Sequence, residues 1–193
     1  MDDILIYSRT LADHINYLRV VFQILVKHGL KVKQSKCSFA QQKLSYLGHS
    51  IRPNGVATEE DKIKAVKDWP TPQSVKDLRS FLGLAGYYRK FVRNFGVFSK
   101  PLTNLLRKDQ PFIWNTVTDA AFQTLKQALI SAPVLAMSDF SLPFVVETDA
   151  SDKGIGAVLM QNDHPIAFLS KALGPRHLGL STYEKESLAI MLQ

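Results

Sequence analysis

The chain has 193 residues, 46% of them apolar, and a formal net charge of +7. This apolar content is enough for one large hydrophobic core or two small ones. No run approaches the roughly 18 apolar residues of a membrane span, and Asp2 and Asp3 stand where a signal peptide carries basic residues. We therefore expect a soluble, intracellular protein, in the cytoplasm or the nucleus, with no membrane partner. Cys37 is the single cysteine, which excludes an internal disulfide.

The charge is distributed unevenly along the chain. Residues 1–137 contain 20 Lys and Arg against 10 Asp and Glu, whereas residues 138–193 contain 4 against 7. A basic surface of this size is typical of proteins that bind polyanions, because cations that neutralise phosphates release condensed counterions. The alternative is a basic surface that serves only solubility.

The first residues predict a strand followed by a helix. Ile4–Tyr7 is short and apolar, as in a buried strand. Thr10 and Asp13 have the spacing of a capping box, and apolar residues then recur at helical spacing until Gly29, a typical C-terminal stop.

The next segment predicts an extended piece and a hairpin. Residues 31–39 are basic, and residues 44–51 have strand character. Pro53-Asn54-Gly55 is a turn signal that leads to Val56.

Capping patterns then predict two helices. Thr58 and Asp61 have the spacing of a cap for a helix that ends before Pro70. Ser74 and Asp77 repeat this pattern at the start of the next helix.

The second of these helices is followed by two glycines, Gly83 and Gly86, which we interpret as sites of helix breaking or close packing rather than as a phosphate loop. Apolar residues then recur at i, i+3, i+4 and i+7, which predicts a further helix. These residues are Tyr88, Phe91, Val92 and Phe95. Another amphipathic helix is predicted around residues 121–129, ending near Pro133.

From Leu142 the apolar period changes from 3.6 to 2. This pattern predicts strands in 144–149, 154–161 and 166–169, and a final helix begins near Ser181.

The acidic pair Asp2-Asp3 directly precedes the first apolar stretch. Adjacent carboxylates are costly unless a cation neutralises them or water solvates them. A hard divalent cation such as Mg²⁺ suits them, and two-metal phosphoryl transfer uses such carboxylates around metals about 3.5–4 Å apart. The alternative is a solvated acidic pair near a terminus.

Met1-Asp2-Asp3-Ile4-Leu5-Ile6-Tyr7-Ser8 resembles the aromatic-x-Asp-Asp-Ile-Leu-Ile-Tyr-Ser segment of gypsy-class LTR retrotransposon reverse transcriptases. Further blocks match the same family in the same order along the whole chain. They are Lys36-Cys37-Ser38-Phe39, Tyr46-Leu47-Gly48-His49, Trp69-Pro70-Thr71-Pro72, Leu78-Arg79-Ser80-Phe81-Leu82-Gly83-Leu84, Tyr87-Tyr88-Arg89, Ala132-Pro133-Val134-Leu135, Thr148-Asp149-Ala150-Ser151 and Gly154-Ile155-Gly156-Ala157-Val158-Leu159.

The resemblance implies that Asp2 and Asp3 lie at the tip of the palm hairpin and ligate the polymerase metals. The family also needs an aspartate from an upstream palm strand, together with the fingers, and these are not in the sequence. Met1 occupies an internal position of the family, so we expect a truncated reading frame. We expect no polymerisation by this chain alone.

The resemblance also places a nucleic-acid-gripping thumb in the middle of the chain. Arg89 and Arg93 lie four residues apart beside the apolar stripe, with Lys90 adjacent and Arg79 one helix earlier. We expect these cations to give weak, sequence-independent, salt-dependent binding to an RNA–DNA hybrid or a template-primer. The alternative is that they form the solvated edge of a helix.

The C-terminal part resembles the opening of a ribonuclease H fold, in which three strands are followed by a helix. The resemblance implies that Asp149 is the first metal ligand and Glu186 the second. Without it, Asp149 is interpreted as a turn residue and Glu186 as a solvated helical charge. The family's other two acidic residues fall beyond Gln193, so we expect an incomplete Mg²⁺ site and no efficient cleavage of the RNA strand.

The predicted fold class is α+β. It comprises a partial reverse-transcriptase palm (1–57), a helical thumb and connection-like region (58–137) and a truncated ribonuclease H-like part (138–193). Two functional hypotheses follow. In the first, the chain is part of a polymerase and ribonuclease H, with the missing parts of the polyprotein as partners. In the second, it is a non-catalytic nucleic-acid-binding remnant or a co-opted piece.

Overall fold

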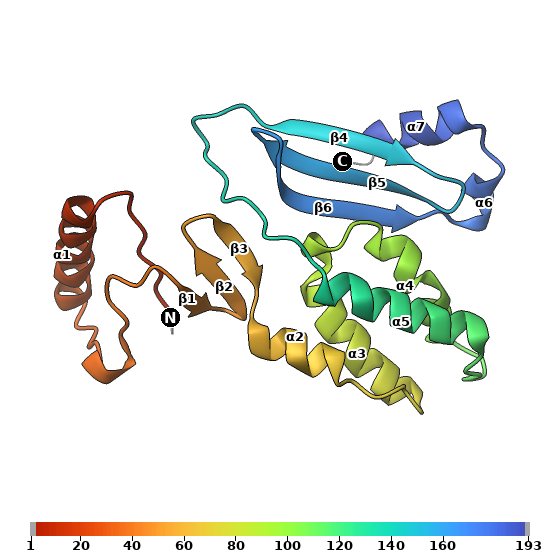
Figure 1. Cartoon of the computed structure of the whole chain (residues 1–193), viewed down its shortest axis with the longest axis horizontal. Helices are drawn as coiled ribbons and strands as arrows, with labels where there is room; N and C mark the ends of the chain where they lie inside the picture. Colours follow the sequence, from red (N-terminus) through yellow and green to blue (C-terminus); the bar gives the residue numbers. More distant parts are fainter. Residues whose placement is uncertain (1–2, 192–193) are drawn as a thin grey trace. The chain divides into compact units, whose positions relative to one another are not determined.

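The computed structural model describes residues 3–191. The chain divides between Pro53 and Asn54 into two compact units, whose helices and strands are labelled in Figure 1. No helix in the described part of the chain has the length and apolar character needed to cross a membrane.

The first unit contains helix α1 (Leu11–Lys27), which begins where the capping pattern predicts. The Thr10 hydroxyl accepts a hydrogen bond of 3.1 Å from the Asp13 backbone N–H. Gly29 follows the helix with a φ of +67°, a left-handed conformation that glycine adopts without strain. The predicted start and stop of this helix are therefore confirmed.

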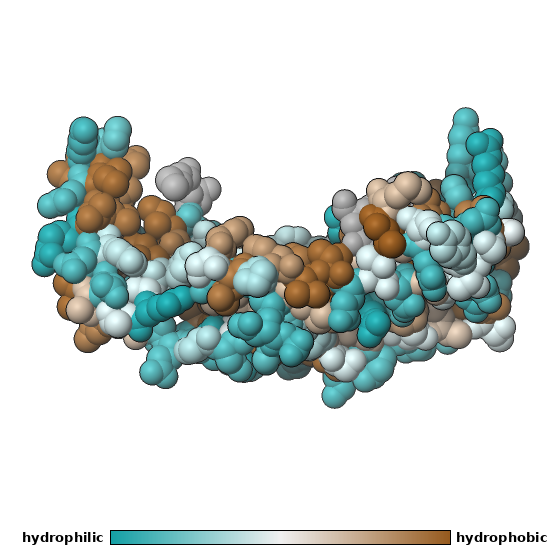
Figure 2. Space-filling model, turned by 90° about the horizontal axis from the view of Figure 1, so that it is seen from above, coloured by the Kyte–Doolittle hydropathy of each residue, from teal (hydrophilic) through white to brown (hydrophobic). Residues whose placement is uncertain are grey.

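Most of the apolar side chains of α1 face solvent. Leu25 is the buried residue of this helix. The exposed ones gather on its surface, coloured brown at the left of Figure 2, and include Leu11, Ile15, Val20, Phe22, Ile24 and Val26. The amphipathic pattern thus predicted the helix, but the first unit does not bury the apolar face of α1.

The strand predicted at Ile4–Tyr7 is wrong, because residues 3–8 form neither helix nor strand. The side chains of Ile4 and Tyr7 are 45% and 70% exposed. A strand needs a neighbour for its backbone N–H and C=O groups, and among the described residues none pairs with this segment.

The rest of the first unit is a 3₁₀ turn, Gln34–Lys36, and the strands β1 (Leu44–Tyr46) and β2 (His49–Arg52). The strands are antiparallel, with Leu44 opposite Ile51. They are joined by Leu47 and Gly48, whose φ angles of +48° and +73° suit the two-residue hairpin turns that match strand twist. The predicted single strand 44–51 is therefore two strands.

The second unit begins with β3 (Gly55–Thr58). The Val56 backbone exchanges two hydrogen bonds with that of Leu135, of 2.7 and 2.8 Å. Gly55 has a φ of +136°, and a Cβ at this position would collide with the Leu135 carbonyl oxygen. A glycine is therefore required where the two segments meet.

Helix α2 (Glu60–Lys67) follows, with Glu59 as its N-cap residue and no side-chain capping bond. The predicted cap at Thr58 is wrong, because Thr58 belongs to β3 and is buried. Strand geometry takes precedence over the local capping pattern at this position.

Helix α3 (Val75–Tyr87) begins as predicted, and the Ser74 hydroxyl accepts a 3.2 Å hydrogen bond from the Asp77 N–H. The helix continues through Gly83 and Gly86, so the predicted break or close packing at these glycines is wrong. Nothing lies within 4 Å of a Cβ built at either position.

The continuous helix predicted from Tyr88 to Phe95 is also wrong. The segment is a 3₁₀ turn, Arg89–Phe91, followed by Asn94 in the left-handed region with a φ of +60°. Helix α4 (Phe95–Asn104) starts only after this break. The predicted apolar positions are nevertheless inside, since Tyr88, Phe91 and Val92 are buried.

Helix α5 (Thr116–Ile130) completes the helical part and is capped by Asn115. The core lies between these helices. Its aromatic centre is the pair Phe81 and Phe122, whose ring centroids are 4.7 Å apart.

A three-stranded antiparallel sheet follows, in the order β4 (Val145–Ala150), β5 (Gly154–Gln161) and β6 (His164–Ala172). The three predicted strands are confirmed, and β6 is longer than expected. Cross-strand partners place Asp149, Gly156 and Ser170 in one row.

Helices cover both faces of this sheet (Figure 1). On one face β6 packs against α4, and the Gly96 backbone N–H donates a 2.8 Å hydrogen bond to the Ser170 hydroxyl. A Cβ at Gly96 would lie 2.8 Å from the Ser170 carbonyl oxygen. After the short helix α6 (Pro175–Leu178), helix α7 (Thr182–Met191) packs against β4 and β5.

Candidate metal-binding and nucleic-acid-binding sites

The first predicted acidic pair is not part of an assembled site in the described residues. Asp2 lies outside them. Asp3 is exposed, in a segment without helix or strand. The palm-hairpin assignment of both residues stays a prediction.

Asp149 lies on β4, and the strand pairing fixes the direction of its side chain. Directly paired residues of an antiparallel sheet point to the same face, so Asp149 shares a face with Ser170, which bonds to the start of α4. Arg93, in the turn before α4, reaches this face. Its guanidinium lies 4.0 Å from the Asp149 carboxylate, and both side chains are about two-thirds exposed, 66% and 67%.

Glu186 lies on α7, whose first turn is fixed by a reciprocal cap. The Ser181 backbone N–H donates to the Glu184 carboxylate at 2.8 Å, and the Glu184 N–H donates to the Ser181 hydroxyl at 3.3 Å. These bonds hold the pKa of the Glu184 carboxyl below its usual range. The Glu186 side chain itself is exposed.

Helix α7 packs against the strand that carries Asp149, but it does not bring a complete set of metal ligands to that strand. Ala150, the next residue on β4, packs with Ile155 against Ala189 of α7. By strand alternation the Asp149 side chain leaves from the other face. Within residues 3–191 no three His, Cys, Asp or Glu side chains are grouped so that they could hold a metal ion. The described residues therefore do not form a two-metal site.

The four predicted nucleic-acid contacts are all exposed and lie on neighbouring elements. Arg79 is on α3, Arg89 and Lys90 are in the 3₁₀ turn, and Arg93 follows that turn. The Lys90 ammonium lies 5.2 Å from the centre of the Phe91 ring. Partial burial lowers the pKa of Lys90. Arg89 and Lys90 are thus held by a turn that is anchored in the core through Phe91.

The structure also contains an ionic contact of Lys185 that the sequence analysis did not predict. Lys185 of α7 is buried, and its ammonium lies 3.2 Å from the carboxylate of Asp152, in the turn between β4 and β5. A signal for it exists in the sequence, because Lys185 stands three and four residues before Leu188 and Ala189, on the apolar side of the helix.

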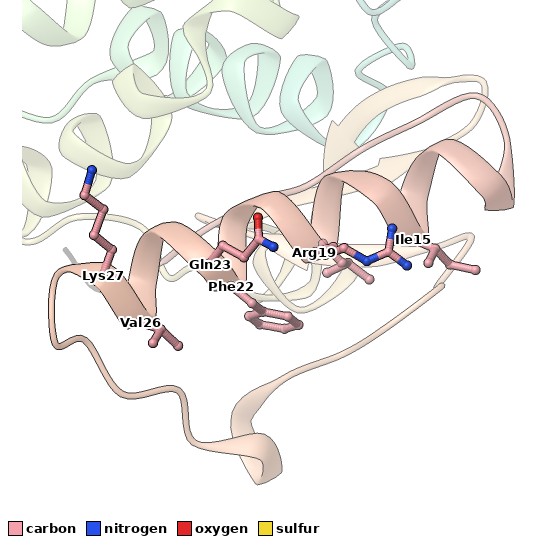
Figure 3. A pocket seen from close by; sticks show the side chains of 7 residues that line it. Ile15, Arg19, Phe22, Gln23, Val26 and Lys27 are labelled. Carbon is pink, nitrogen blue, oxygen red and sulfur yellow. The ribbon is translucent and has the colours of Figure 1, made fainter.

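The first unit carries a shallow groove on α1, far along the chain from these residues (Figure 3). Its lining is mainly apolar, with Phe22 and Val26 flanked by Arg19 and Lys27. It contains no carboxylate, so it does not resemble a metal site.

Two family models match the chain. The model described as reverse transcriptase (RNA-dependent DNA polymerase) matches residues 1–51, and the RNase H-like domain found in reverse transcriptase matches residues 114–193. Curated relatives match nearly the whole chain. A retrovirus-related Pol polyprotein from transposon 297 of Drosophila melanogaster is 41% identical over 99% of this chain. The Pol polyprotein from transposon gypsy of the same species is 36% identical over 99%.

Over nearly its whole length the chain is similar to retrotransposon Pol polyproteins. It spans 18% of the transposon 297 polyprotein and 15% of the Tf2-3 polyprotein of Schizosaccharomyces pombe, which is 37% identical. The resemblance found in the sequence is thereby confirmed, as a match to a short part of much longer proteins.

Solved structures agree with the family and the fold. A foamy viral protease-reverse transcriptase in complex with double-stranded DNA superimposes with a TM-score of 0.87 at 26% identity, covering 95% of this chain and 33% of that one. A second, in complex with an RNA/DNA hybrid, gives 0.86 and covers 96% and 26%. The predicted mixed fold with reverse-transcriptase and RNase H-like parts is confirmed for this chain.

Proposed function

We propose that this Pol segment binds an RNA–DNA hybrid or template-primer duplex through the cations of α3 and the following 3₁₀ turn. The observation that carries the proposal is the exposure of Arg79, Arg89, Lys90 and Arg93 on neighbouring elements, with Arg93 beside Asp149. The foamy viral relatives, which were solved with double-stranded DNA and with an RNA/DNA hybrid, support it. Backbone phosphates are the natural partners of such cations.

In the proposal the parent polyprotein copies RNA into DNA and degrades the RNA strand of the hybrid. Asp2 and Asp3 would serve the first reaction, and Asp149 and Glu186 the second. Mg²⁺, when bound, would stabilise the charge that develops on the transferred phosphate. The residues of this chain contribute duplex binding and part of each acidic set.

The alternative is a non-catalytic nucleic-acid-binding remnant. The absence of a group of three potential metal ligands in residues 3–191 favours it as a description of the isolated chain. Both hypotheses predict that the chain binds a duplex, and they differ in whether the RNA strand of the hybrid is hydrolysed.

Binding is tested by fluorescence anisotropy with a labelled RNA–DNA hybrid over a range of salt concentrations. The variant Arg89→Gln/Lys90→Gln removes the two cations of the 3₁₀ turn. We expect it to weaken binding and to reduce the slope of log K against log salt by about 1 for each phosphate that is no longer neutralised.

The chain offers a matched control. Arg107 and Lys108 are an exposed Arg-Lys pair in the same order, beyond the end of α4. Arg107→Gln/Lys108→Gln changes the net charge equally and should leave the salt slope near that of the wild type. Equal effects of the two double variants would contradict the proposed binding surface.

Hydrolysis is tested with the same hybrid in Mg²⁺. We expect the isolated chain to leave the RNA strand intact and to extend no primer. Mg²⁺-dependent cleavage that disappears in Asp149→Asn would show instead that the chain assembles a working site.

A further inference from the structure

Lys185 is an unusual residue in the sheet–helix interface, because its side chain is only 6% exposed. Lysines are rarely buried to this extent unless they are paired. Its ammonium donates a 3.2 Å hydrogen bond to the carboxylate of Asp152, whose own side chain is 97% exposed. The ion pair thus has one end inside the protein and one end in water.

The turn that presents Asp152 is held by hydrogen bonds between its own residues. The Ser151 N–H donates to the Gly154 carbonyl at 2.8 Å, and the Gly154 N–H donates back to the Ser151 hydroxyl at 3.2 Å. The next residue is tied to the end of the sheet, since the Lys153 carbonyl accepts from the Leu173 N–H at 3.0 Å. These bonds hold the backbone on both sides of Asp152, three residues after Asp149.

The apolar contact of α7 with the sheet is small by comparison. Its buried members are Ala189 from the helix with Ile155 and Leu173 from the sheet side. Apolar contacts are non-directional, so a contact of this size holds the helix against the sheet but sets its rotation weakly. A charge-assisted hydrogen bond is directional, so it can set the rotation of the helix.

We propose that Lys185 is a positioning residue, which fixes the rotation of α7 on the sheet through Asp152 and thereby sets where Glu186 stands relative to the strand of Asp149. The inference rests on the proposed function in one respect, namely that Glu186 acts together with Asp149. The ionic tether itself is a property of the fold.

The two partners of the ion pair should differ in the effect of their removal, because Lys185 is buried and Asp152 is exposed. Removing Asp152 leaves a buried ammonium without its partner, which is costly. Removing the charge of Lys185 with a side chain of similar length leaves Asp152 in water, where it needs no partner. Asp152→Ala should therefore be harmful only while Lys185 is present.

Hydrogen exchange of the α7 amides in the full chain tests this asymmetry. We expect Asp152→Ala to raise their exchange rates about tenfold, and Asp152→Ala/Lys185→Met to return them towards the wild-type values. Lys76→Met, at an exposed lysine of α3, is the matched control. Unchanged protection in Asp152→Ala, or equal loss in the single and double variants, would overturn the tether.

A distance measurement tests positioning separately from stability. Spin labels are placed at Val146 on β4 and Tyr183 on α7, which are 51% and 78% exposed, with Cys37→Ser as the background. We expect a narrow distance distribution for the wild type and for Lys185→Arg, and a broader or shifted one for Lys185→Met. An unchanged distribution in Lys185→Met would remove the positioning role.

Both experiments are done without metal or nucleic acid, so their outcome is independent of the proposed function. If the tether is found but no hybrid binds, the proposed function fails and the positioning role survives. If the hybrid binds but substitutions of Asp152 and Lys185 do not affect α7, the positioning role fails and the proposed function survives.

Discussion

The guanidinium of Arg93 lies 4.0 Å from the carboxylate of Asp149, which joins a predicted phosphate-binding cation to a predicted metal ligand. The two residues come from different parts of the chain and meet because the turn before α4 packs against the sheet. Gly96 bonds to Ser170 in the same row of the sheet as Asp149. The ion pair therefore follows from the docking of the helical part on the RNase H-like sheet.

Arg93→Gln should change binding more than stability. Exposed ion pairs contribute about 0–1 kcal/mol, and both side chains here are well exposed. We expect the free energy of unfolding in urea to change by about 0.5 kcal/mol or less, while hybrid affinity falls and the salt slope decreases by about 1. A large loss of stability with unchanged binding would show that Arg93 is structural.

Substitution by alanine should have opposite effects on stability at two helical glycines, Gly96 at the contact of α4 with β6 and Gly83 in α3. A Cβ at Gly96 would lie 2.8 Å from the Ser170 carbonyl oxygen, so the backbones must move apart in Gly96→Ala. We expect a loss of about 1–3 kcal/mol in the free energy of unfolding. Gly83→Ala, in the middle of α3 with open space around it, should add about 0.4–1 kcal/mol. Chemical denaturation of both variants checks the sign, and destabilisation by both would contradict the space found at Gly83.

Local signals in the sequence predicted the helix starts at Thr10 and Ser74, because a cap depends on bonds within one turn of the chain. They failed where a distant segment decides the backbone. Asn94 is left-handed and breaks the apolar stripe of Tyr88 to Phe95, and the helix that starts beyond it is the one docked on Ser170. Periodicity identified the buried positions there but not the helix.

From the sequence, only the motif residues of the candidate site could be predicted. The resemblance located Asp149 on a strand and Glu186 on the helix after the sheet, and the structure has both elements. The ionic partners of these elements were not predicted, since Arg93 was interpreted as a phosphate-binding cation and Lys185 was not singled out. Contacts made by tertiary packing, such as Lys185 with Asp152, leave little trace in local spacing.

Tyr88 should make the second unit sensitive to alkaline pH. Burial raises the pKa of its hydroxyl to about 12, with smaller contributions from Glu59 and Tyr87. The folded pKa lies above the unfolded value of about 10, so the stabilisation is fully present below pH 10 and is lost as the pH rises towards 12. We expect urea midpoints to fall over this range, and to fall less in Tyr88→Phe. Tyr7→Phe, at a tyrosine that is 70% exposed, is the control and should follow the wild type.

Glu184 should show the opposite dependence, at acid pH. Hydrogen bonds from the backbone and side chain of Ser181 lower the pKa of its carboxyl. The cap on α7 therefore contributes above the unfolded pKa, near 4.3, and is lost as the pH falls through the lower folded value. An NMR titration should place the Glu184 midpoint below the usual range of a glutamate, and Ser181→Ala should raise it. Because alanine keeps the backbone N–H at position 181, a Glu184 midpoint that does not respond to Ser181→Ala would show that the Ser181 hydroxyl does not bond to the Glu184 carboxylate in solution.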